Sequence, residues 1–534
     1  MRRATNRLAH EIFDLLIVGG GATGACVARD AAMRGLSVAL IDKGDFANAT
    51  SAHNSKLVHG GLRYLRNFEL GLVRESLKER RIWQRIALHL VHPLPFLIPL
   101  TDSSLANRAM LTAGMTLYDL LSFDRGWLSD PGQRLPGHSW LGREAALARE
   151  PVLEAPGFAG AFEYYDAQMY APERLALECI LDADAHGAAI ANYVEAGTLL
   201  LRDGGVEGCH ARDRVGGAVF DVRAKTVLVA AGPWADLFLA HATGKPAAHK
   251  LLRSKGIHLL TPPLTHDAAL TIEAGAGHIF ILPWRGHTLI GTTDTAFQGD
   301  PDSVGVSESD IADFLALINR YLPGAKLARG DVEYFYAGLR PLVDDGSGST
   351  YNASRRAELI DHGAEDGVAG LFSALGGKWT TSRNLAETIT DAVVKKLGKA
   401  ARPCATATMP LPGGRMARFD EFEKGRAAVN PDLPSLRHLA HMYGTRLPGV
   451  LAAGDTGLLG PSGDIAAQIA FSVREEMAMT LADIVMRRTG IGQFGPPSAQ
   501  TLRAAASLMA KEMDWDEARC ASEIASLAPY YKAV

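Results

Sequence analysis

The pattern of apolar and polar residues near the N-terminus predicts a strand, a turn and a helix, in that order. Leu15–Val18 is a short run of branched apolar side chains, which is typical of a buried parallel strand. An amphipathic segment, Ala22–Arg34, follows it, and a second apolar run covers Leu36–Ile41. This order of elements predicts the start of a Rossmann-type fold.

The glycines between the first strand and the helix fit a phosphate-binding turn. Gly19, Gly21 and Gly24 have the spacing G-x-G-x-x-G. In such a turn the first glycine permits the tight bend, the second lets the backbone approach a pyrophosphate, and the third lets the helix pack closely on the sheet. Asp42 ends the second strand roughly twenty residues later, where a carboxylate binds the ribose hydroxyls of an adenine dinucleotide. We therefore predict a dinucleotide site. Asp42 disfavours a 2′-phosphate but does not distinguish NAD from FAD.

Between residues 160 and 240 the pattern alternates between strands and helices. The segment GAFEYYDAQMY, a helix over Pro172–His186 and a strand over Ala189–Val194 resemble a further β-α-β unit that returns to the nucleotide sheet. Lys225–Gly232 predicts another buried strand, after which Pro233 and Trp234 open a helix.

A helix is predicted over Glu69–Arg85, where apolar residues fall near helical spacing. We interpret its charged face as a solvated surface, and the alternative is a basic face that rests on anionic lipid. The cations of this face are Arg74, Lys78, Arg80, Arg81 and Arg85. An extended segment held by prolines is predicted over His92–Leu100, and a helix over Arg108–Leu121.

The pattern changes character after residue 250. Strand-like runs at Gly256–Leu260, His278–Leu282 and Thr288–Gly291 are separated by turns, which predicts an antiparallel sheet. A helix over Ser309–Tyr321 interrupts this sheet.

Near residue 376 a strand runs into two glycines and then into a helix. We expect Lys378, Thr380 and Thr381 in the first turn of this helix, whose positive end can point at a flavin ring. Beyond the proline-containing linker Arg402–Gly414, the remainder reads as helices and loops, with one helix over Asp464–Arg488.

Composition narrows the class of protein. A chain of 534 residues predicts two or three domains, and 47% apolar with 21% charged residues is typical of a globular enzyme. The net charge of −4 argues against bulk nucleic-acid binding. Five scattered cysteines without a C-x-x-C pair favour neither disulfides nor structural zinc, so a reducing cytoplasm is expected. The basic N-terminus has no apolar signal core, and the uncharged stretch between Arg85 and Asp102 is too short and too broken to span a bilayer.

Six motifs occur in an order that resembles a known family. They are GGGATG, TSAHNSKLVHGGLRYL, GPWA, GTTDTAFQGD, YAGLRPL and GGKWTTSRNLAE. As a set they resemble the FAD-dependent glycerol-3-phosphate dehydrogenases, which belong to the flavoenzyme superfamily that includes D-amino-acid oxidase. The likeness covers most of the chain and extends more weakly to Leu436–Arg488. The chain departs from the family pattern at Ala52, His53 and Asn54, at Ser382, and at Phe297.

The resemblance implies a fold of class α/β plus α+β in three domains. A Rossmann-type FAD-binding domain is expected over residues 12–90, 165–240 and 350–398. A substrate-binding domain with an antiparallel sheet is expected over residues 91–164 and 241–349, and an all-helical C-terminal domain over residues 415–534.

The same resemblance implies an activity. Bound FAD would oxidise sn-glycerol 3-phosphate to dihydroxyacetone phosphate, with hydride passing from C2 to flavin N5 and the electrons then to a membrane quinone. The protein would sit on the inner face of the cytoplasmic membrane, and a homodimer is considered. Alternatives are another polyol phosphate such as erythritol 4-phosphate, oxygen as acceptor, an amino-acid or amine oxidase, and a flavoprotein without activity that serves as a scaffold.

Candidate site residues follow from the motifs and from the chemistry of an anionic alcohol. Arginine holds a phosphate with a planar fork, lysine acts as a point charge, and histidine accepts a proton near neutral pH. The catalytic candidates are His59, His258, Arg340 and Lys378. The substrate-binding candidates are Arg63, Tyr64, Arg340 and Lys378. The cofactor-binding candidates are Gly19, Gly21, Gly24, Asp42, Thr50, Ser51, Val194, Gly232 and Gly377. No metal site is predicted.

Overall fold

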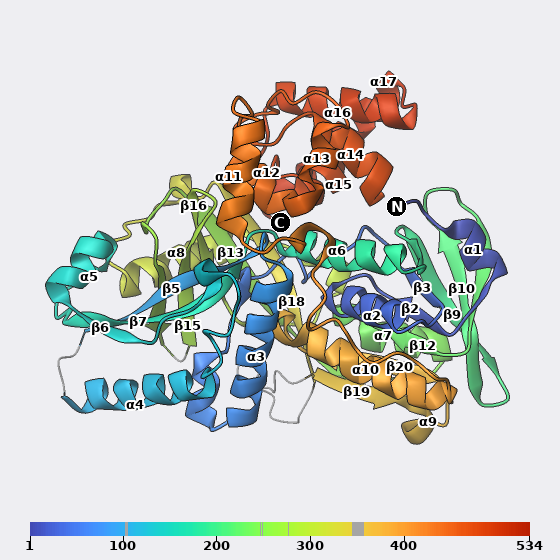
Figure 1. Cartoon of the computed structure of the whole chain (residues 1–534), viewed down its shortest axis with the longest axis horizontal. Helices are drawn as coiled ribbons and strands as arrows, with labels where there is room; N and C mark the ends of the chain where they lie inside the picture. The colour runs from blue at the N-terminus through green and yellow to red at the C-terminus, as the bar shows by residue number, and fades with distance from the viewer. Residues whose placement is uncertain (102–104, 246, 248, 276, 344–356) are drawn as a thin grey trace.

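The structure is a computed structural model that describes residues 1–101, 105–245, 247, 249–275, 277–343 and 357–534. For residues 63, 66, 67, 105 and 106 it describes the backbone only. Two large sheets lie side by side, and the C-terminal helices cover them from above (Figure 1).

The nucleotide sheet has six strands in the order β19-β20-β12-β2-β3-β8. Their bounds are β2 Leu15–Val18, β3 Val38–Ile41, β8 Ala189–Ala191, β12 Val227–Val229, β19 Ala357–Asp361 and β20 Leu371–Gly376. All neighbours are parallel except β19 and β20. The predicted Rossmann-type sheet is therefore confirmed.

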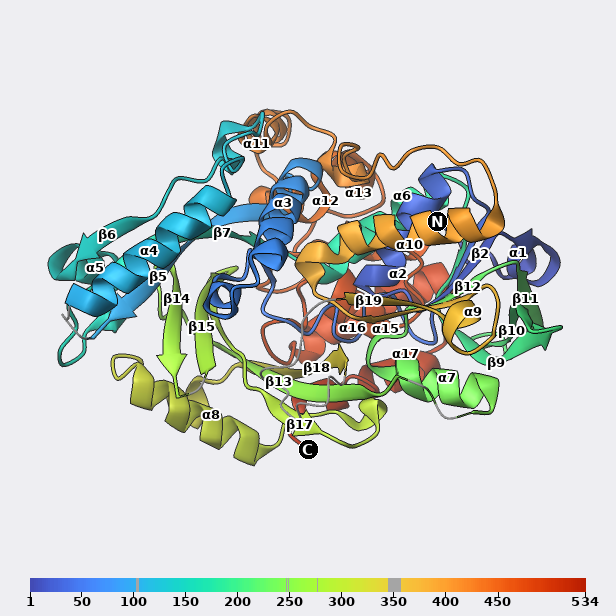
Figure 2. The ribbon, with the colours of Figure 1, turned by 90° about the horizontal axis from the view of Figure 1, so that it is seen from below.

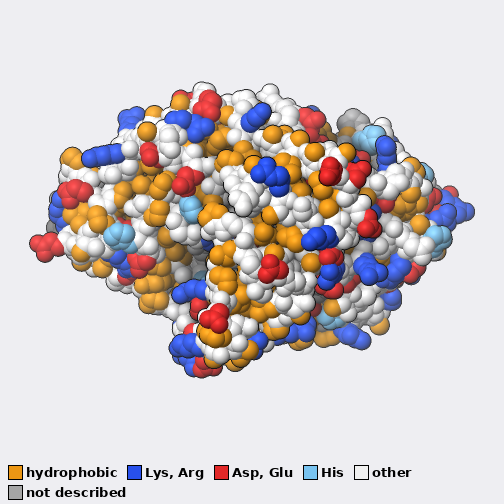
Figure 3. All heavy atoms as spheres, turned by 90° about the horizontal axis from the view of Figure 1, so that it is seen from above, with side chains coloured by type: hydrophobic (Ala, Val, Ile, Leu, Met, Phe, Trp, Pro, Cys, Tyr) orange, Lys and Arg blue, Asp and Glu red, His pale blue; other side chains and the backbone are white. Residues whose placement is uncertain are grey.

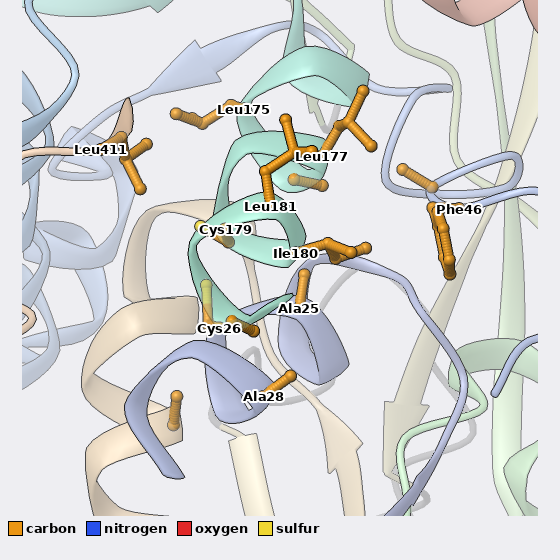
Figure 4. Close-up of a cluster of buried hydrophobic side chains, with 14 of the residues drawn as sticks. Ala25, Cys26, Ala28, Phe46, Leu175, Leu177, Cys179, Ile180, Leu181 and Leu411 are labelled. Carbon is orange, nitrogen blue, oxygen red and sulfur yellow. The ribbon is translucent and has the colours of Figure 1, made fainter. Parts of the chain in front are cut away.

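Three helices pack together on one face of this sheet: α2 Ala22–Met33, α6 Pro172–Ala185 and α10 Ser382–Leu397. The contact between α2 and α6 is built from small and medium side chains, with Ala25, Cys26 and Ala28 facing Cys179 and Ile180 (Figure 4). Small residues let the two helices approach closely, and this fixes the α2 N-terminus against the sheet.

A second, four-stranded sheet covers the other face, which sequence analysis did not predict. Its order is β1-β11-β10-β9, with bounds β1 Ile12–Phe13, β9 Val194–Arg202, β10 Gly205–Asp213 and β11 Val219–Ala224. Apolar residues of these strands, such as Val206, Cys209 and Val222, are buried in one cluster with Leu16 and Ala39 of the nucleotide sheet. The nucleotide sheet is thus the middle layer of three.

The substrate sheet has ten strands, and only β5 and β14 pair in parallel. Its strands are β4 Leu57–Val58, β5 Val91–Leu100, β6 Ser139–Gly142, β7 Gly160–Met169, β13 Leu251–Thr261, β14 Ala269–Ala274, β15 Gly277–Trp284, β16 His287–Gly291, β17 Thr295–Phe297 and β18 Tyr334–Val343. Helix α8, Glu308–Tyr321, packs on one face. Helices α3, Leu70–Ile86, and α4, Leu105–Leu121, lie on the other (Figure 2).

The C-terminal region is helical, as predicted. Its helices are α11 Phe419–Val429, α12 Leu436–Tyr443, α13 Leu447–Leu451, α14 Ala467–Glu476, α15 Leu481–Asp483, α16 Ala499–Met513 and α17 Glu517–Ala525, with a π-helical turn over Ile484–Arg488. The single helix predicted over Asp464–Arg488 is wrong. Met477 adopts a left-handed conformation with φ of 57°, and Thr480 then caps a new helix.

Two further predictions are wrong. Strand β7 pairs with β5 in the substrate sheet, so the expected β-α-β unit contributes only α6 and β8 to the nucleotide sheet. The strand predicted over Ala189–Val194 ends at Ala191, because Tyr193 turns the chain with φ of 56° and Val194 starts a strand of another sheet.

The face of α3 is also less solvated than predicted. Arg80 is only 1% exposed, and its guanidinium is paired with the buried carboxylate of Asp166. Arg74 and Arg81 share the buried Asp124. No helix in the described ranges has the length and apolar character needed to cross a bilayer.

Candidate active site

A single cavity of about 900 Å³ runs between the nucleotide sheet and the substrate sheet. One end is formed by the turn after β2 and by Asp42 at the end of β3, and the other by the strands β15 and β18 and by Lys378. Because one continuous cavity touches both the glycine turn and the substrate sheet, a single bound molecule can reach from one to the other.

The glycine turn has the close contacts that the motif predicts. Gly19 has a φ of 109°, and a Cβ there would lie 2.6 Å from the carbonyl oxygen of Ala230. A Cβ on Gly24 would lie 1.9 Å from the carbonyl oxygen of Gly19, so only glycine lets α2 begin this close to β2. Gly21 lines the cavity beside Ser51, whose Oγ accepts a 2.8 Å hydrogen bond from the Ala22 N–H. Gly21, Ala22 and Thr23 thus bring the N-terminus of α2 to the cavity wall.

Asp42 is held at the end of β3 by backbone donors. Its carboxylate accepts hydrogen bonds from the N–H of Gly20 at 2.7 Å and of Gly44 at 2.9 Å. Burial raises the pKa of Asp42 to about 6, although these two donors oppose the shift. The N–H of Val194 donates to the Asp42 carbonyl at 2.8 Å, which brings β9 to the same end of the cavity.

The other predicted cofactor residues also line the cavity. Thr50 donates from Oγ1 to the Leu339 carbonyl at 2.6 Å, which ties the loop after β3 to β18. Gly232 and Gly377 line the wall at the ends of β12 and β20, with φ of 52° and 93°. The segments that follow four strands of the nucleotide sheet, β2, β3, β12 and β20, thus line the same cavity.

Arg340 of β18 is oriented by hydrogen bonds at the substrate end of the cavity. Nη1 donates to Ser254 Oγ at 2.8 Å, and Nη2 donates to Thr292 Oγ1 at 2.7 Å. Ser254 donates in turn to Asp294 Oδ1 at 2.7 Å. A Cβ on Gly256 would lie 2.4 Å from Arg340 Nη2, so this glycine provides the space for the guanidinium.

Lys378, Tyr64 and His59 lie at the same end. The Lys378 ammonium is 4.6 Å from the centre of the Tyr64 ring, and both residues line the cavity. His59 packs edge-on against Phe280, with ring centres 6.3 Å apart. Lys378 precedes a 3-10 turn, Trp379–Thr381, and α10 begins only at Ser382, so the prediction that Lys378 and both threonines form the first turn of the helix is wrong. The predicted Arg63 has its side chain outside the described residues.

His258 of β13 lies behind the cavity wall. Its Nε2 is 2.9 Å from Oγ of Ser55, which does line the cavity, and its ring stacks on Tyr336 with centres 4.9 Å apart. Burial and the nearby charges of Arg340 and Lys56 hold the pKa of His258 well below its usual range. The imidazole is therefore neutral at physiological pH, and it contacts the cavity through Ser55.

Several residues of the cavity wall were not among those predicted from the sequence. Thr292, Thr293 and Asp294 lie in the motif GTTDTAFQGD, which pointed to this segment without assigning a role to any of them. His278 and Phe280 come from β15, and nothing in their sequence context indicated a site. Of the departures from the family pattern, Asn54 and Ser382 line the cavity, and His53 stacks on Tyr336.

A parallel sheet with a glycine turn, joined to a second sheet by one long cavity, defines a dinucleotide-dependent oxidoreductase. The chain belongs to the family of FAD-dependent oxidoreductases, whose model matches residues 14–392. Residues 404–520 match the C-terminal domain of alpha-glycerophosphate oxidase.

Individual relatives match over nearly the whole chain. A glycerol-3-phosphate dehydrogenase of Synechocystis is 37% identical, and the match covers 97% of this chain and 96% of the relative. An alpha-glycerophosphate oxidase of Streptococcus pyogenes is 31% identical over 98% of this chain and 95% of the relative. The crystal structure of a glycerol-3-phosphate dehydrogenase from Bacillus halodurans, complexed with FAD, superposes with a TM-score of 0.77 at 28% identity, covering 99% and 96% of the two chains.

The residues of the cavity fit FAD. The α2 N-terminus and Gly21 suit a pyrophosphate, and the Asp42 carboxylate is placed for ribose hydroxyls. The distance from this end to Lys378 is spanned by one continuous cavity, as a dinucleotide with a flavin ring requires.

Proposed function

We propose that the protein uses FAD to oxidise sn-glycerol 3-phosphate to dihydroxyacetone phosphate. The observation that carries the proposal is the meeting of Arg340, Lys378, Tyr64 and His59 at one end of a cavity whose other end fits a dinucleotide. The names of the two relatives and of the Bacillus structure support the same substrate. An anionic alcohol needs cations for its phosphate and an acceptor for its hydroxyl proton, and this end offers both.

Each residue at the substrate end of the cavity has its own proposed role. We assign the phosphate to Lys378 and, through its motif, to Arg63, with Tyr64 shaping the pocket. We assign Arg340 to the substrate oxygen, because its fixed guanidinium stabilises negative charge that develops there. His59 would take the hydroxyl proton, and His258 would orient Ser55 beside the substrate. When bound, FAD supplies a two-electron acceptor for the hydride that the substrate carbon loses.

Anaerobic mixing of the FAD-loaded protein with sn-glycerol 3-phosphate tests this proposal. We expect the flavin absorbance to bleach, whereas glycerol, which lacks the phosphate, should leave it unchanged. A flavin that stays oxidised with glycerol 3-phosphate but bleaches with another polyol phosphate or an amino acid would contradict the assigned substrate. A flavin that responds to none of these would favour a scaffold.

The role of Lys378 has its own test. Replacing it with Gln should raise the KM for glycerol 3-phosphate about 10- to 100-fold, since a charged hydrogen bond to phosphate is lost. The matched control is Lys395→Gln at the far end of α10, which should leave KM unchanged. An unaltered KM in Lys378→Gln would contradict the assignment.

For the electron acceptor we propose a quinone in the membrane, with the protein bound to the inner face of the cytoplasmic membrane. The oxidase among the relatives favours oxygen as the second candidate. Steady-state turnover with a soluble quinone analogue, compared with peroxide production in air, distinguishes the two. Fast quinone reduction without peroxide is the expected result, and stoichiometric peroxide would contradict it.

A further inference from the structure

Two glycines lie between residues that we assign to the substrate. His59 comes before them, and Tyr64 follows in the 3-10 turn Leu62–Asn67. We call residues 59–64 the substrate turn. Gly61 has a φ of 77°, and a Cβ there would lie 2.3 Å from the Tyr64 ring. Because glycine restricts its own backbone least of all residues, contacts from other elements must fix where His59 and Tyr64 lie.

A buried carboxylate, Asp166 of β7, makes one of these contacts. Its Oδ1 accepts hydrogen bonds from the Gly60 N–H at 3.2 Å and from Arg80 Nη1 at 2.5 Å. Its Oδ2 accepts from the Tyr118 hydroxyl at 2.8 Å. Asp166 and Arg80 are each 1% exposed, and Tyr118 is 2% exposed. Water therefore does not compete for these hydrogen bonds, and the acceptor of the Gly60 N–H has a fixed direction.

The groups around Asp166 are chosen to donate to it. Burial and the charge of Asp166 hold the pKa of Tyr118 well above its usual range, so the hydroxyl keeps its proton. Burial also raises the pKa of Asp166, which the charge and the hydrogen bond of Arg80 oppose. Arg80 donates to the Tyr165 carbonyl as well, at 3.1 Å. A Cβ on Gly60 would lie 2.3 Å from the Tyr118 hydroxyl, so this glycine lets the donors meet at one carboxylate.

A second contact fixes the neighbouring peptide groups of the substrate turn. Thr380 Oγ1 accepts from the His59 N–H at 3.2 Å and lies 3.3 Å from the His59 carbonyl. The Thr380 carbonyl accepts from Trp83 Nε1 at 3.1 Å. Trp83 and Arg80 are three residues apart on α3 and hence on one side of this helix. Figure 2 shows α3 between α4, which carries Tyr118, and α10, which follows Thr380, so α3 supports both contacts.

The pair of Arg80 and Asp166 differs from charged pairs at the surface. The C-terminal side of the molecule shows acidic and basic side chains mixed across its surface (Figure 3), where water weakens an ion pair. A buried pair often adds no more stability than apolar side chains of similar size. Stability alone is therefore a poor reason for this pair, whereas an acceptor of fixed direction beside His59 is a specific one.

We propose that Asp166 is a positioning residue that orders the substrate turn, so that His59 lies ready to take the hydroxyl proton. Asp166 does not line the cavity, and it acts through the Gly60 peptide group. The proposal rests on the role of His59 in the proposed oxidation of glycerol 3-phosphate, to which it adds a residue outside the cavity.

Anaerobic flavin reduction by sn-glycerol 3-phosphate, normalised to bound FAD, tests the proposal. Asp166→Ala removes the acceptor of the Gly60 N–H, so we expect the limiting rate to fall about 100-fold. The concentration for half-saturation should change little, because Lys378 stays in place, whereas Lys378→Gln should show the reverse pattern. Asp166→Asn keeps an oxygen that can accept from Gly60 and should recover about tenfold of the lost rate.

Stability is measured on the same variants. Asp166→Ala and Asp166→Asn both leave Arg80 without its counter-charge, so we expect similar losses in the urea midpoint. A difference in rate between the two variants then cannot come from stability. Equal rates in both, each far below the wild-type rate, would overturn the proposal, since the hydrogen bond to Gly60 would not matter.

Asp182→Asn is the matched control. Asp182 of α6 pairs with Arg29 of α2 at 2.7 Å, and both side chains are 2% exposed. Neither residue lines the cavity. This variant should lose stability as the Asp166 variants do but reduce its flavin at the wild-type rate. A fall in rate equal to that of Asp166→Ala would overturn the proposal, because the loss of any buried ion pair would then have the same effect.

Hydrogen exchange followed by mass spectrometry observes the substrate turn without substrate. Peptides that contain Gly60 should exchange about tenfold faster in Asp166→Ala, and at the wild-type rate in Asp182→Asn. Unchanged exchange in Asp166→Ala would reject the role of Asp166. So would normal bleaching in this variant, which leaves the substrate unaffected. Faster exchange in Asp166→Ala, with a wild-type protein that glycerol 3-phosphate does not bleach, would reject the substrate and keep Asp166 as the residue that orders the turn.

Discussion

At the scale of single residues, the site depends on small side chains that leave room for large charged ones. Gly256 and Arg340 lie on paired strands, and a methyl group on Gly256 would collide with the guanidinium of Arg340. The orientation of Arg340 therefore depends on a residue that touches no substrate. Ser254 and Thr292 complete the same arrangement from the other side.

Gly256→Ala tests this dependence. The new Cβ would also lie 2.4 Å from Thr292 Oγ1, so the arginine must move away from its hydrogen-bond partners. We expect kcat/KM for glycerol 3-phosphate to fall about a hundredfold, as misplacement of a catalytic group by about 1 Å does, with FAD still bound. Gly425→Ala, in the helix α11 where nothing lies within 4 Å of the added methyl, is the control and should keep full activity. Equal activity in both variants would show that Arg340 tolerates displacement.

At the scale of elements, buried ion pairs join the C-terminal helices to the nucleotide domain. Arg174 of α6 donates from Nη1 to Glu476 Oε2 of α14 at 2.6 Å, and Arg446 donates to the same carboxylate at 2.8 Å. Arg174 and Glu476 are fully buried. The two arginines lower the pKa of Glu476 to about 2 although burial opposes the shift, which shows how strongly the carboxylate is bound.

Removing this carboxylate should destabilise the protein strongly. Glu476→Ala leaves the buried Arg174 and the partly exposed Arg446 without their shared counter-charge, for which we expect a loss of about 3–5 kcal/mol in the free energy of unfolding, measured in urea. Arg474 lies on α14, as Glu476 does, and forms an exposed ion pair with Glu512 of α16. Glu512→Ala breaks this pair and should cost no more than about 0.5 kcal/mol. Similar losses in the two variants would mean that the buried ion pair contributes no more to the free energy of unfolding than the exposed one.

The elements show what the sequence could and could not predict. Leu15–Val18 and the three glycines were found because strand, turn and helix signals coincide within twenty or so consecutive residues. The four-stranded sheet was missed, although β9, β10 and β11 are consecutive and pair as neighbours; only its edge strand β1 comes from a distant part of the chain. The helix over Asp464–Arg488 was wrong because a left-handed Met477 gives no signal in composition.

In the site, too, residues within a local motif could be predicted, whereas contacts between distant strands could not. Motif residues such as Arg340 and Lys378 could be proposed from the sequence, but the burial of His258 behind Ser55 depends on the pairing of β13 with β18. His278 carries no local pattern at all. The residue-by-residue roles stay predictions until kinetics test them.

At the scale of the whole molecule, a group of buried histidines lies where the C-terminal helices meet the rest of the chain. His441 stacks between Tyr170 and Phe419, with ring centres 4.6 Å and 4.4 Å apart, and His92 packs edge-on against it. Burial lowers the pKa of His92 to about 4 and holds the pKa of His441 well below its usual range. A proton on either ring would place a charge in this contact.

The pH dependence of stability follows with a definite sign. The unfolded chain binds a proton at His92 near pH 6.5, but the folded protein does so only near pH 4, so unfolding takes up protons between these values. The contribution of His92 to stability should be constant above about pH 7 and fall as the pH drops, with a loss of about 2 kcal/mol at about pH 5. Thermal unfolding across this range measures the loss, and His92→Gln should make the fall smaller by about the contribution of His92, while the other buried histidines keep theirs. The control His10→Gln, which removes an exposed histidine, should leave the pH dependence of stability unchanged. A curve that is unchanged in His92→Gln would contradict this account.

The order of strands in the nucleotide sheet has a consequence for how the chain is made. The central strands β12 and β2 come from residues 227–229 and 15–18, and β20, the neighbour of β12, comes from residues 371–376. The glycine turn is therefore synthesised early, but β20 and β19 can join the sheet only when most of the chain has been made. Contacts this distant in sequence form slowly, and the exposed strands in the meantime are prone to aggregate. Nascent chains that end before Leu371 should fail to retain FAD, and chaperones that hold unfinished chains should be needed most during this interval.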